Sequence, residues 1–421
     1  MVVTRFAPSP TGFLHSGNYR TALFSYLYAK KHNGRFLVRI EDTDKARSKK
    51  EFEDNILESL AWLGLDYEKL YRQSERTDIY KTYLKKLIDE GKAFISQETE
   101  GERKEVIRFK NPNKKVVFHD LIRGDIEMDT TDLGDFVIAR SMEEPVFHLV
   151  VVIDDFEMGI THIVRGEDHI SNTPRHILIQ EAIGAPIPTY AHLPLILAKD
   201  RSKLSKRKGA LPLTDYRDLG YLKEAVINYL AMLGWNPGTN KELFTLDELV
   251  QDFSLEKVQK SGAIFDDEKL KWFNKQYISK MSLDEFKKVA EPFVTNVHEK
   301  LWPLLKERTT LLSELRDLSE FDFMNKKPDF QKEKLNWKDT PANKARLEET
   351  KKIILSVSDF TKENVKAALW PFAEKEGRGE VLWPLRIALS GKDKSPDPFI
   401  LCELLGKEES ISRIDYAISL L

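Results

Sequence analysis

Residues 2–40 read VVTRFAPSPTGFLHSGNYRTALFSYLYAKKHNGRFLVRI, and this stretch decides the fold. Val2–Phe6 is a strand candidate that ends in a loop rich in proline and glycine. Tyr19–Lys31 carries apolar residues at helical spacing, and Phe36–Ile40 is a second strand. A strand, a helix and a strand in this order predict a right-handed parallel unit, so the expected fold class is α/β.

Further elements follow along the chain. Ser48 and Glu51 match a capping box at the start of a helix that ends at Gly64. Residues 71–144, with one amphipathic helix and short polar strands, indicate an α+β insertion. The parallel pattern returns with the apolar run Leu149–Ile153, which predicts a fully buried strand. Beyond about residue 215 the apolar periodicity is helical.

Composition limits the class of protein. A length of 421 residues predicts about three domains. The net charge of −2 means that any RNA contact must come from local patches of Lys and Arg. Cys402 is the only cysteine, which excludes an internal disulfide and a zinc site of the multi-cysteine kind. The sequence has no signal-peptide pattern and no long apolar run, so we expect a cytoplasmic protein without a membrane span.

Two segments carry the candidate chemistry. Residues 7–18 form a loop between a strand and a helix, where α/β proteins hold phosphates, and this loop contains His15 and Gly17. Alone, it is more typical of an ordinary turn with a polar residue at a helix end. Residues 199–209, KDRSKLSKRKG, are strongly basic. A solvated loop explains such a run, and so does a loop that stabilises a departing pyrophosphate.

Together the two segments resemble the signature pair of class I aminoacyl-tRNA synthetases, whose family forms are written HIGH and KMSKS. Short sequence motifs around them, which we call words, are similar to those of bacterial glutamyl-tRNA synthetases and occur in that family's order. These words are TRFAPSPTG (4–12), RIEDTD (39–44), Asp154-Asp155, VRGEDHISNTP (164–174) and KLSKR (203–207). The strong match covers residues 1–70 and 145–280, and LWPLR (382–386) extends it weakly into the C-terminal part.

The resemblance implies a Rossmann-like parallel-sheet catalytic domain, split by the insertion and followed by mostly α-helical domains. We expect residues 1–70 and 145–200 to form the catalytic domain and 71–144 a shortened insertion that binds the acceptor stem. Residues 201–295 would form a stem-contact domain with the second signature loop, and 296–421 a helical anticodon-binding domain.

The reaction that the resemblance implies has two steps. The α-carboxylate of glutamate attacks the α-phosphate of ATP and pyrophosphate leaves. The glutamyl group then moves to the 3′-terminal adenosine of the tRNA. Mg²⁺ would accompany ATP and bridge its phosphates, and we expect neither zinc nor a metal site made by the protein alone. By resemblance the catalytic residues are His15, Lys203, Ser205, Lys206 and Arg207.

The resemblance also implies the residues that bind the two small substrates. Those that bind ATP are Pro8, Ser9, Thr11, Gly12, His15, Gly17, Asn18 and Lys206. Those that bind glutamate are Arg5, Ala7, Ser9, Glu41, Phe147, Arg165 and His169. Arg5 would take the side-chain carboxylate, while Ser9, Glu41 and Arg165 would take the amino and α-carboxyl end. Without the resemblance, an ordinary surface or inter-strand ion pair is the better explanation of Arg5 and Glu41.

Three residues depart from the family pattern. Ser16 and Asn18 replace the Ile and the final His or Gly that are usual in the first signature. Phe147 stands where many relatives have a tyrosine near the glutamate side chain. A lost phenol removes one hydrogen bond, worth roughly 0.5–1.5 kcal/mol, so we expect a higher KM for glutamate.

Several rival functions fit less well. A paralogue of the glutamyl-queuosine type stops after the second signature, a glutaminyl-tRNA synthetase has a β-rich C-terminal part, and a small nucleotidylyltransferase would not need this length. A catalytically inactive RNA-binding relative tends to lose the counterparts of His15 or Lys206, and both are present. The family suggests a monomer that charges tRNA(Glu). The sequence leaves open whether tRNA(Gln) is charged as well, and which residues contact the anticodon.

Overall fold

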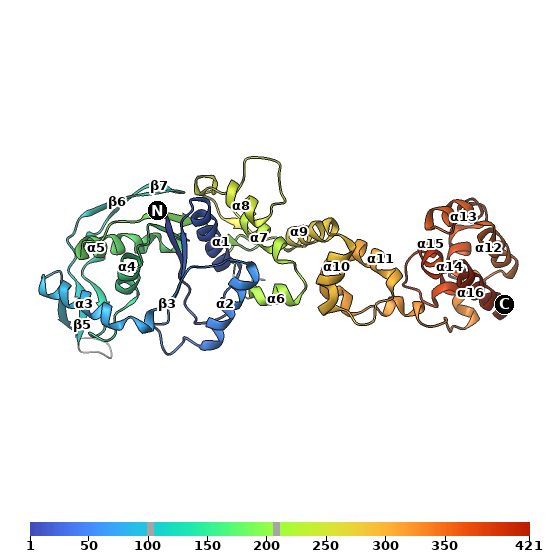
Figure 1. Cartoon of the computed structure of the whole chain (residues 1–421), viewed down its shortest axis with the longest axis horizontal. Helices are drawn as coiled ribbons and strands as arrows, with labels where there is room; N and C mark the ends of the chain where they lie inside the picture. The colour runs from blue at the N-terminus through green and yellow to red at the C-terminus, as the bar shows by residue number, and fades with distance from the viewer. Residues whose placement is uncertain (99–104, 205–210) are drawn as a thin grey trace. The chain divides into compact units, whose positions relative to one another are not determined.

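The structure, a computed structural model, describes residues 1–98, 105–204 and 211–421 (Figure 1). It divides into two compact units, Met1–Tyr277 and Ile278–Leu421. Every strand of the described residues lies in the first unit, and the second unit is built from helices. The predicted α/β class with a mostly helical C-terminal part is therefore confirmed.

The described strands of the first unit form four hydrogen-bonded sheets, ordered β1-β2-β3, β7-β6-β10-β9, β4-β5-β8 and β11-β12. Their bounds are β1 Val3–Phe6, β2 Arg35–Ile40, β3 Leu70–Arg72, β4 Ala93–Gln97, β5 Glu105–Phe109, β6 Lys115–Asp120, β7 Gly124–Asp129, β8 Phe136–Ala139, β9 His162–Gly166, β10 Thr189–Leu193, β11 Ile196–Leu197 and β12 Ala263–Ile264.

Helices cover these sheets and build the rest of the chain. In the first unit they are α1 Ser16–Lys31, α2 Lys50–Leu63, α3 Thr77–Asp89, α4 Phe147–Glu157, α5 Thr173–Ile183, α6 Leu213–Asp218, α7 Lys223–Met232 and α8 Leu246–Asp252. The helix α9, Asp267–Lys280, contains the boundary between the units. In the second unit they are α10 Leu283–Ala290, α11 Trp302–Arg308, α12 Lys344–Ser356, α13 Lys362–Glu376, α14 Arg378–Ser390, α15 Pro398–Leu405 and α16 Lys407–Leu420.

The predicted parallel unit at the start of the chain is confirmed. β1 pairs in parallel with β2, and β2 pairs in parallel with β3. The backbone N–H of Thr161, just before β9, donates to the carbonyl of Val3 in β1 at 3.0 Å. The polar side chains at the carboxyl ends of β1 and β9, Arg5 and Arg165, therefore reach the same region, which is where parallel sheets bind ligands.

Strands from residues 71–144 extend this architecture. β10 pairs in parallel with both β9 and β6, and β6 pairs antiparallel with β7. The residue in register with Tyr190 of β10 is Asp120, the last residue of β6. A segment that interrupts the parallel pattern in the sequence thus adds strands to the sheet that carries Arg165.

The prediction of a strand over Leu149–Ile153 is wrong, because these residues lie in the helix α4 (Figure 1). All five side chains are at most 2% exposed. An element buried on every side shows no alternation of polar and apolar residues, so its sequence does not distinguish a helix from a strand. Tertiary burial here overrides the strand preference of the β-branched residues.

The capping box predicted at Ser48 and Glu51 is also wrong. α2 begins at Lys50, and the preceding residue, Lys49, makes no side-chain cap. The backbone N–H of Ser48 instead donates to the carbonyl of Asp44 at 2.9 Å, which places Ser48 in the turn before the helix. The predicted end at Gly64 is confirmed, with the left-handed φ of 68° that favours glycine.

The second unit packs α12 to α16 around an apolar core. Val365, Leu369, Leu385 and Ile414 in this core have no exposed surface. No helix in the described part of the chain is both long and apolar enough to cross a membrane.

Candidate active site

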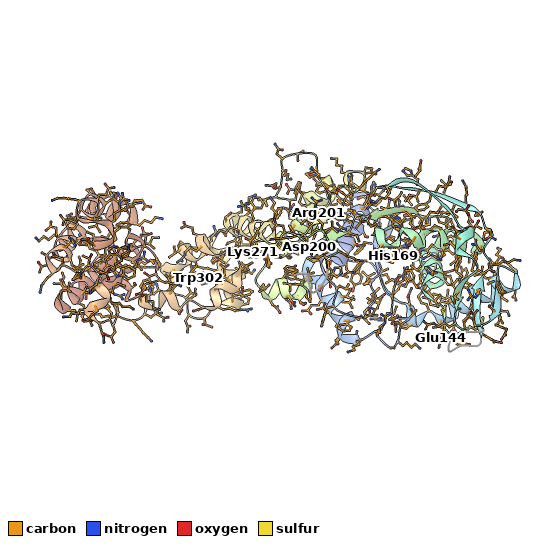
Figure 2. The ribbon with its side chains drawn as sticks, turned by 180° about the vertical axis from the view of Figure 1, so that it is seen from behind. Glu144, His169, Asp200, Arg201, Lys271 and Trp302 are labelled. Carbon is orange, nitrogen blue, oxygen red and sulfur yellow. The ribbon has the colours of Figure 1, made fainter. Side chains whose placement is uncertain are left out.

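A cavity of about 420 Å³ lies at the carboxyl ends of β1 and β9, beside the start of α1. The predicted site residues on its wall are Arg5, Ala7, Pro8, Ser9, Thr11, His15, Gly17, Asn18, Glu41, Phe147, Arg165, His169 and Lys203. His169 lies among the side chains of the first unit (Figure 2). Gly12 belongs to the same loop but not to the cavity wall. Ser205, Lys206 and Arg207 lie outside the described residues.

His15 is the N-cap residue of α1. Its ring Nδ1 accepts from the backbone N–H of Gly17 at 3.1 Å. The backbone N–H of His15 donates to Asn18 Oδ1 at 3.2 Å. Because Nδ1 is an acceptor, a neutral ring carries its proton on Nε2, which is then a donor. Asn18 departs from the family signature and completes the capping box. A Cβ at position 17 would lie 3.0 Å from His15 Cε1, so a glycine preserves this arrangement.

Ser16, the other departure in the signature, is 2% exposed. Its hydroxyl has no hydrogen-bond partner among the described residues. An unsatisfied buried polar group costs about 1–3 kcal/mol. A buried hydroxyl without a partner is unfavourable, and Ser16 does not line the cavity.

A buried network of charges lies behind Arg5. Both Arg5 and Arg39 donate to Asp155 Oδ1, at 3.0 and 2.7 Å. Arg39 Nη2 also donates to Glu41 Oε1 at 3.0 Å. The neighbouring Asp154 pairs with Arg39 and Arg76 at 3.7 and 2.7 Å. Buried charges need such partners, and this network connects two residues on the cavity wall, Arg5 and Glu41.

Two carboxylates of this network, those of Asp155 and Glu41, have shifted pKa values. Burial would raise the pKa of Asp155, but the adjacent Arg5 and Arg39 outweigh burial and lower the pKa. Burial raises the pKa of Glu41, and Arg39 opposes this effect without reversing it. At this end of the cavity the arginines thus influence the pKa values of both Asp155 and Glu41. Such perturbed pKa values are typical of sites where a charged ligand binds.

Arg165 has surroundings of a different kind. Its Nε donates to His192 Nε2 at 3.1 Å, Nη1 lies 3.2 Å from His176 Nδ1, and Nη2 donates to Thr173 Oγ1 at 2.7 Å. Burial lowers the pKa of Arg165 to about 10. Burial also lowers the pKa of His169 to about 4, and the charge of Arg165 adds to this effect. The imidazoles near Arg165 are therefore neutral at physiological pH.

Lys203 and Leu204, the two residues of the second signature that the structure describes, line the cavity. Lys203 Nζ lies 3.2 Å from Asp168 Oδ2, and both side chains are about half exposed. The backbone N–H of Leu204 donates to the carbonyl of Ile196 in β11 at 2.9 Å. These contacts hold the first two residues of the KLSKR word against the cavity wall.

The sequence reasoning missed several residues of the site. The sequence singled out neither Arg39 nor Asp120 nor His192 as a site residue, and it gave Asp154-Asp155 no role in the site. The one available signal was Arg39, a charged residue inside an apolar strand, because a buried charge needs partners. The partners of Arg39 are distant in the sequence, so its surroundings give no local pattern.

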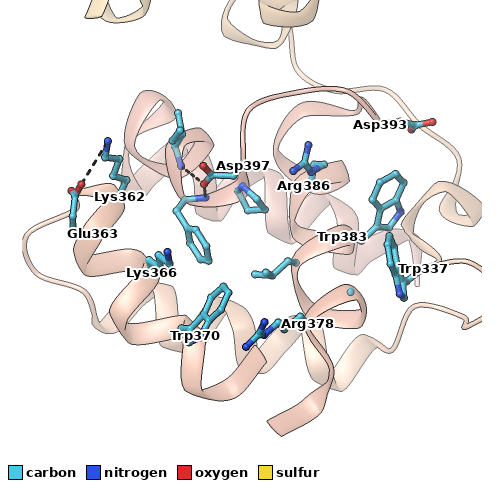
Figure 3. A pocket seen from close by; sticks show the side chains of 15 residues that line it. Trp337, Lys362, Glu363, Lys366, Trp370, Arg378, Trp383, Arg386, Asp393 and Asp397 are labelled. Carbon is cyan, nitrogen blue, oxygen red and sulfur yellow. Dashed lines mark hydrogen bonds and ion pairs between the residues drawn. The ribbon is translucent and has the colours of Figure 1, made fainter. Parts of the chain in front are cut away.

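A second cavity, of about 900 Å³, lies in the second unit (Figure 3). The residues on its wall are Trp337, Lys362, Glu363, Lys366, Trp370, Arg378, Gly379, Leu382, Trp383, Arg386, Asp393, Asp397, Pro398, Phe399 and Ile400. Figure 3 shows Trp337 beside Trp383 at one end, and Trp370 with Lys366 and Arg378 at the other. We call this cavity the tryptophan groove.

Cations lie over the indole ring of Trp370 in this groove. Arg378 Cζ is 4.6 Å and Lys366 Nζ 5.2 Å from the ring centroid. The rings of Trp337 and Trp383 are 5.5 Å apart. Aromatic faces next to basic side chains are the chemistry that binds unpaired nucleotides, through base stacking and phosphate contacts.

Known families match this chain over nearly its whole length. Residues 1–105 and 95–272 match the family described as tRNA synthetases class I (E and Q), catalytic domain. Residues 250–418 match the family described as anticodon binding domain. The chain is 42% identical to a glutamate–tRNA ligase of Aquifex aeolicus, with 98% of both chains covered. It is 40% identical to the glutamate–tRNA ligase of a Sulfurihydrogenibium species, again with 98% of both covered.

Solved structures agree with these matches. A glutamate tRNA ligase from Elizabethkingia meningosepticum, crystallised in complex with its amino acid, superimposes with a TM-score of 0.86 at 37% identity. That comparison covers 100% of this chain and 99% of the other. The chain therefore belongs to the glutamate–tRNA ligases, class I aminoacyl-tRNA synthetases that use ATP to join glutamate to tRNA.

Proposed function

We propose that the cavity between β1, β9 and α1 binds ATP and glutamate side by side and forms glutamyl-adenylate there. The observation that carries this proposal is the meeting of His15, Lys203, Arg5, Arg165 and Glu41 at one cavity wall. The α-carboxylate oxygen of glutamate attacks the α-phosphorus, and the bond to the bridging oxygen of pyrophosphate breaks. The enzyme contributes no nucleophile, so positioning and charge neutralisation supply the rate enhancement.

The proposed ATP half contains the first signature segment and Lys203 of the second. His15 donates from Nε2 to a phosphate oxygen, because Nδ1 is already an acceptor. The loop residues Pro8, Ser9, Thr11 and Gly12, with Gly17 and Asn18, surround the nucleotide. Lys203, together with Ser205, Lys206 and Arg207, meets the charge that builds on the departing pyrophosphate.

The proposed glutamate half contains two arginines and one acid. Arg5 and Arg165 bind the two carboxylates, and Glu41 with Ser9 binds the ammonium group. Among the described residues Arg5 is already paired with Asp155, whereas Arg165 is held by imidazoles and a hydroxyl. This difference favours Arg165 as the stronger anion-binding group of the two. Ala7 and His169 complete the wall.

One side of the glutamate half is apolar. Phe147 and Val151, both from α4, line the cavity there. Phe147 has no hydroxyl to offer a carboxylate, so the arginines must supply more of the recognition. We propose that this wall raises the KM for glutamate relative to family members with a tyrosine at this position.

Mg²⁺ fits this site as an ion carried by ATP. No group of three His, Cys, Asp or Glu side chains in the described residues is arranged to hold a metal ion. Magnesium is commonly held by substrate phosphates and water rather than by an all-protein cage. When bound, it neutralises charge on the phosphate oxygens, while His15 and Lys203 contact the triphosphate from the protein side.

The second substrate is tRNA, and we propose where it binds. We propose that the chain has the domains expected from its sequence. Their ranges are 1–70 with 145–200, 71–144, 201–295 and 296–421. Residues 71–144 would contact the acceptor stem, and the tryptophan groove would hold unpaired anticodon bases. The indole of Trp370, with the cations of Lys366 and Arg378 close to its ring, supports this role. We further propose a monomer that acts in the cytoplasm.

The test of the activation site is ATP–pyrophosphate exchange with the full chain, with and without tRNA. We expect exchange that depends on glutamate and does not occur with glutamine or aspartate. The matched variant is Arg165→Lys, which keeps a charge but loses the fork of donors and should raise the KM for glutamate but not that for ATP. Exchange that is independent of glutamate, or an unchanged KM in the variant, contradicts the assignment. Charging of purified tRNA(Gln) decides whether tRNA(Gln) is a second RNA substrate.

A further inference from the structure

Arg165 forms no ion pair with a carboxylate among the described residues, although it is only 7% exposed. Two imidazoles and a hydroxyl hold it instead. His192 Nε2 accepts from Nε, His176 Nδ1 faces Nη1, and Thr173 Oγ1 accepts from Nη2. All three partners are at most 2% exposed. Every guanidinium nitrogen thus has a neutral partner, and the positive charge remains available to an anionic ligand.

The chain of hydrogen bonds continues on both sides of Arg165. His192 Nδ1 lies 2.6 Å from Asp120 Oδ2, and Asp120 has no exposed surface. The other oxygen of Asp120 accepts two backbone N–H groups of the following turn at 2.9 Å, which prevents the carboxylate from turning away. On the far side His176 Nε2 lies 3.1 Å from His148 Nδ1.

These distances determine where the ring protons lie. A guanidinium only donates and a carboxylate only accepts. His192 must therefore carry its proton on Nδ1, toward Asp120, and present a lone pair on Nε2 to Arg165. His176 must accept from Arg165 at Nδ1, so its proton lies on Nε2 and is donated to His148. A doubly protonated ring at His192 would point an N–H bond at the Nε–H of Arg165.

We propose that Asp120 and His192 are positioning residues for glutamate recognition, which orient the Arg165 guanidinium toward the substrate carboxylate through the chain Asp120–His192–Arg165. This inference rests on the proposed role of Arg165 in binding glutamate. His192 lies directly opposite Arg165 in the register of β9 and β10, so its ring fixes the guanidinium from the neighbouring strand. Asp120 fixes the ring from the end of β6, which belongs to the insertion range 71–144.

The first test is steady-state kinetics of the full chain at saturating tRNA. His192→Leu removes the acceptor and should raise the KM for glutamate by about tenfold or more, since a hydrogen bond to a charged group is lost. The KM for ATP should stay the same. His192→Gln places an amide oxygen near the position of Nε2 and should recover most of the loss. Asp120→Asn removes the carboxylate that sets the tautomer and should shift the KM in the same direction as His192→Leu.

His162→Leu is the matched control. His162 lies in β9, the strand next to that of His192, and its ring bonds to Thr161 rather than to Arg165. It should leave both KM values unchanged. A folded His192→Leu variant whose KM for glutamate matches the wild type overturns the proposal. So does a parallel rise in the KM for ATP, which would indicate general disturbance. If Arg165→Lys leaves the KM for glutamate unchanged, the proposed role of Arg165 fails. If only the His192 and Asp120 variants lack an effect, this inference alone fails.

A second test needs no variant and so does not depend on whether His192→Leu folds. A neutron structure of the deuterated wild-type protein at neutral pH should show deuterium on Nδ1 of His192 and on Nε2 of His176, and none on Nε2 of His192. Deuterium on Nε2 of His192 would overturn the proposal, because that ring would then not accept from Arg165.

Discussion

The guanidinium of Arg39 donates to the carboxylate of Asp155 at 2.7 Å, although the two residues are 116 positions apart in the chain. The same Asp155 oxygen accepts from Arg5, a residue on the cavity wall. Arg39 also holds Glu41. One buried ion pair thus supports both the arginine and the acid at one end of the proposed glutamate site.

The first prediction concerns this ion pair. Asp155→Asn keeps the shape of the side chain but leaves the buried charges of Arg39 and Arg5 less compensated. Breaking a buried pair from one side typically costs about 3–5 kcal/mol, so we expect the free energy of unfolding to fall by that amount. Because Arg5 loses its partner, the KM for glutamate should rise as well. Denaturant unfolding followed by circular dichroism measures the first effect and aminoacylation kinetics the second.

Glu127→Gln is the control for Asp155→Asn. Glu127 pairs with Lys115 across β6 and β7, and both side chains are more than half exposed. Exposed ion pairs contribute about 0–1 kcal/mol, so this variant should unfold almost like the wild type. An Asp155→Asn variant as stable as Glu127→Gln would show that the network is not the main support of this end of the cavity.

Phe147→Tyr is a gain-of-function prediction. The added phenol restores one donor to the apolar wall and should lower the KM for glutamate by about two- to tenfold, the equivalent of one hydrogen bond. Phe156→Tyr makes the same change in the same helix at a residue that is 36% exposed, and it should have no effect. If the KM does not fall in Phe147→Tyr, the ring does not face the glutamate side chain.

Lys206→Ala tests the second signature loop. Removing a cation that stabilises the departing pyrophosphate should slow glutamate activation by about two to three orders of magnitude. The affinity for tRNA should be nearly unchanged, which a filter-binding titration measures beside single-turnover activation. A large loss of tRNA affinity with normal activation would instead make Lys206 an RNA contact.

Trp370→Ala tests the tryptophan groove. Loss of one stacking platform costs about 1–3 kcal/mol per base, so the Kd for tRNA should rise by about five- to 150-fold. The KM for glutamate at saturating tRNA should not change. Tyr416→Ala, an aromatic residue of the same unit that is 40% exposed and does not line the groove, is the control. Equal losses in both variants would contradict a specific role for the groove.

Acid should destabilise the first unit through two partly buried histidines, His148 and His169. Burial lowers the pKa of His148 and of His169 from 6.5 to about 4. Below pH 6.5 these two histidines therefore become protonated in the unfolded chain, whereas in the folded chain they stay neutral down to about pH 4. The free energy of unfolding should fall with falling pH in this range, by up to about 1.4 kcal/mol per pH unit for each histidine. His148→Phe should show a smaller slope in denaturant titrations at several pH values, and an identical slope would contradict the assignment.

Local sequence determined the elements that begin the fold. The strand of Val3–Phe6, the helix that starts after His15 and its neighbour Arg35–Ile40 follow from residues close together in the chain. Apolar spacing, breakers and caps act over a few residues, so a sequence displays them directly. The resemblance of the signature words then indicated the family, and most of the residues it pointed to line one cavity.

Tertiary structure decided what depends on burial and on distant partners. Leu149–Ile153 forms a helix and not a strand, because an element buried on all sides carries no periodic signal. Asp120 reaches His192 across 72 positions, and Arg39 reaches Asp155 across 116. A buried charge takes whichever partner the fold brings near, and that partner has no fixed spacing in the sequence. The sequence by itself therefore determined which chemistry this chain carries, and only the packed structure decided which neighbours hold Arg5, Glu41 and Arg165 in place.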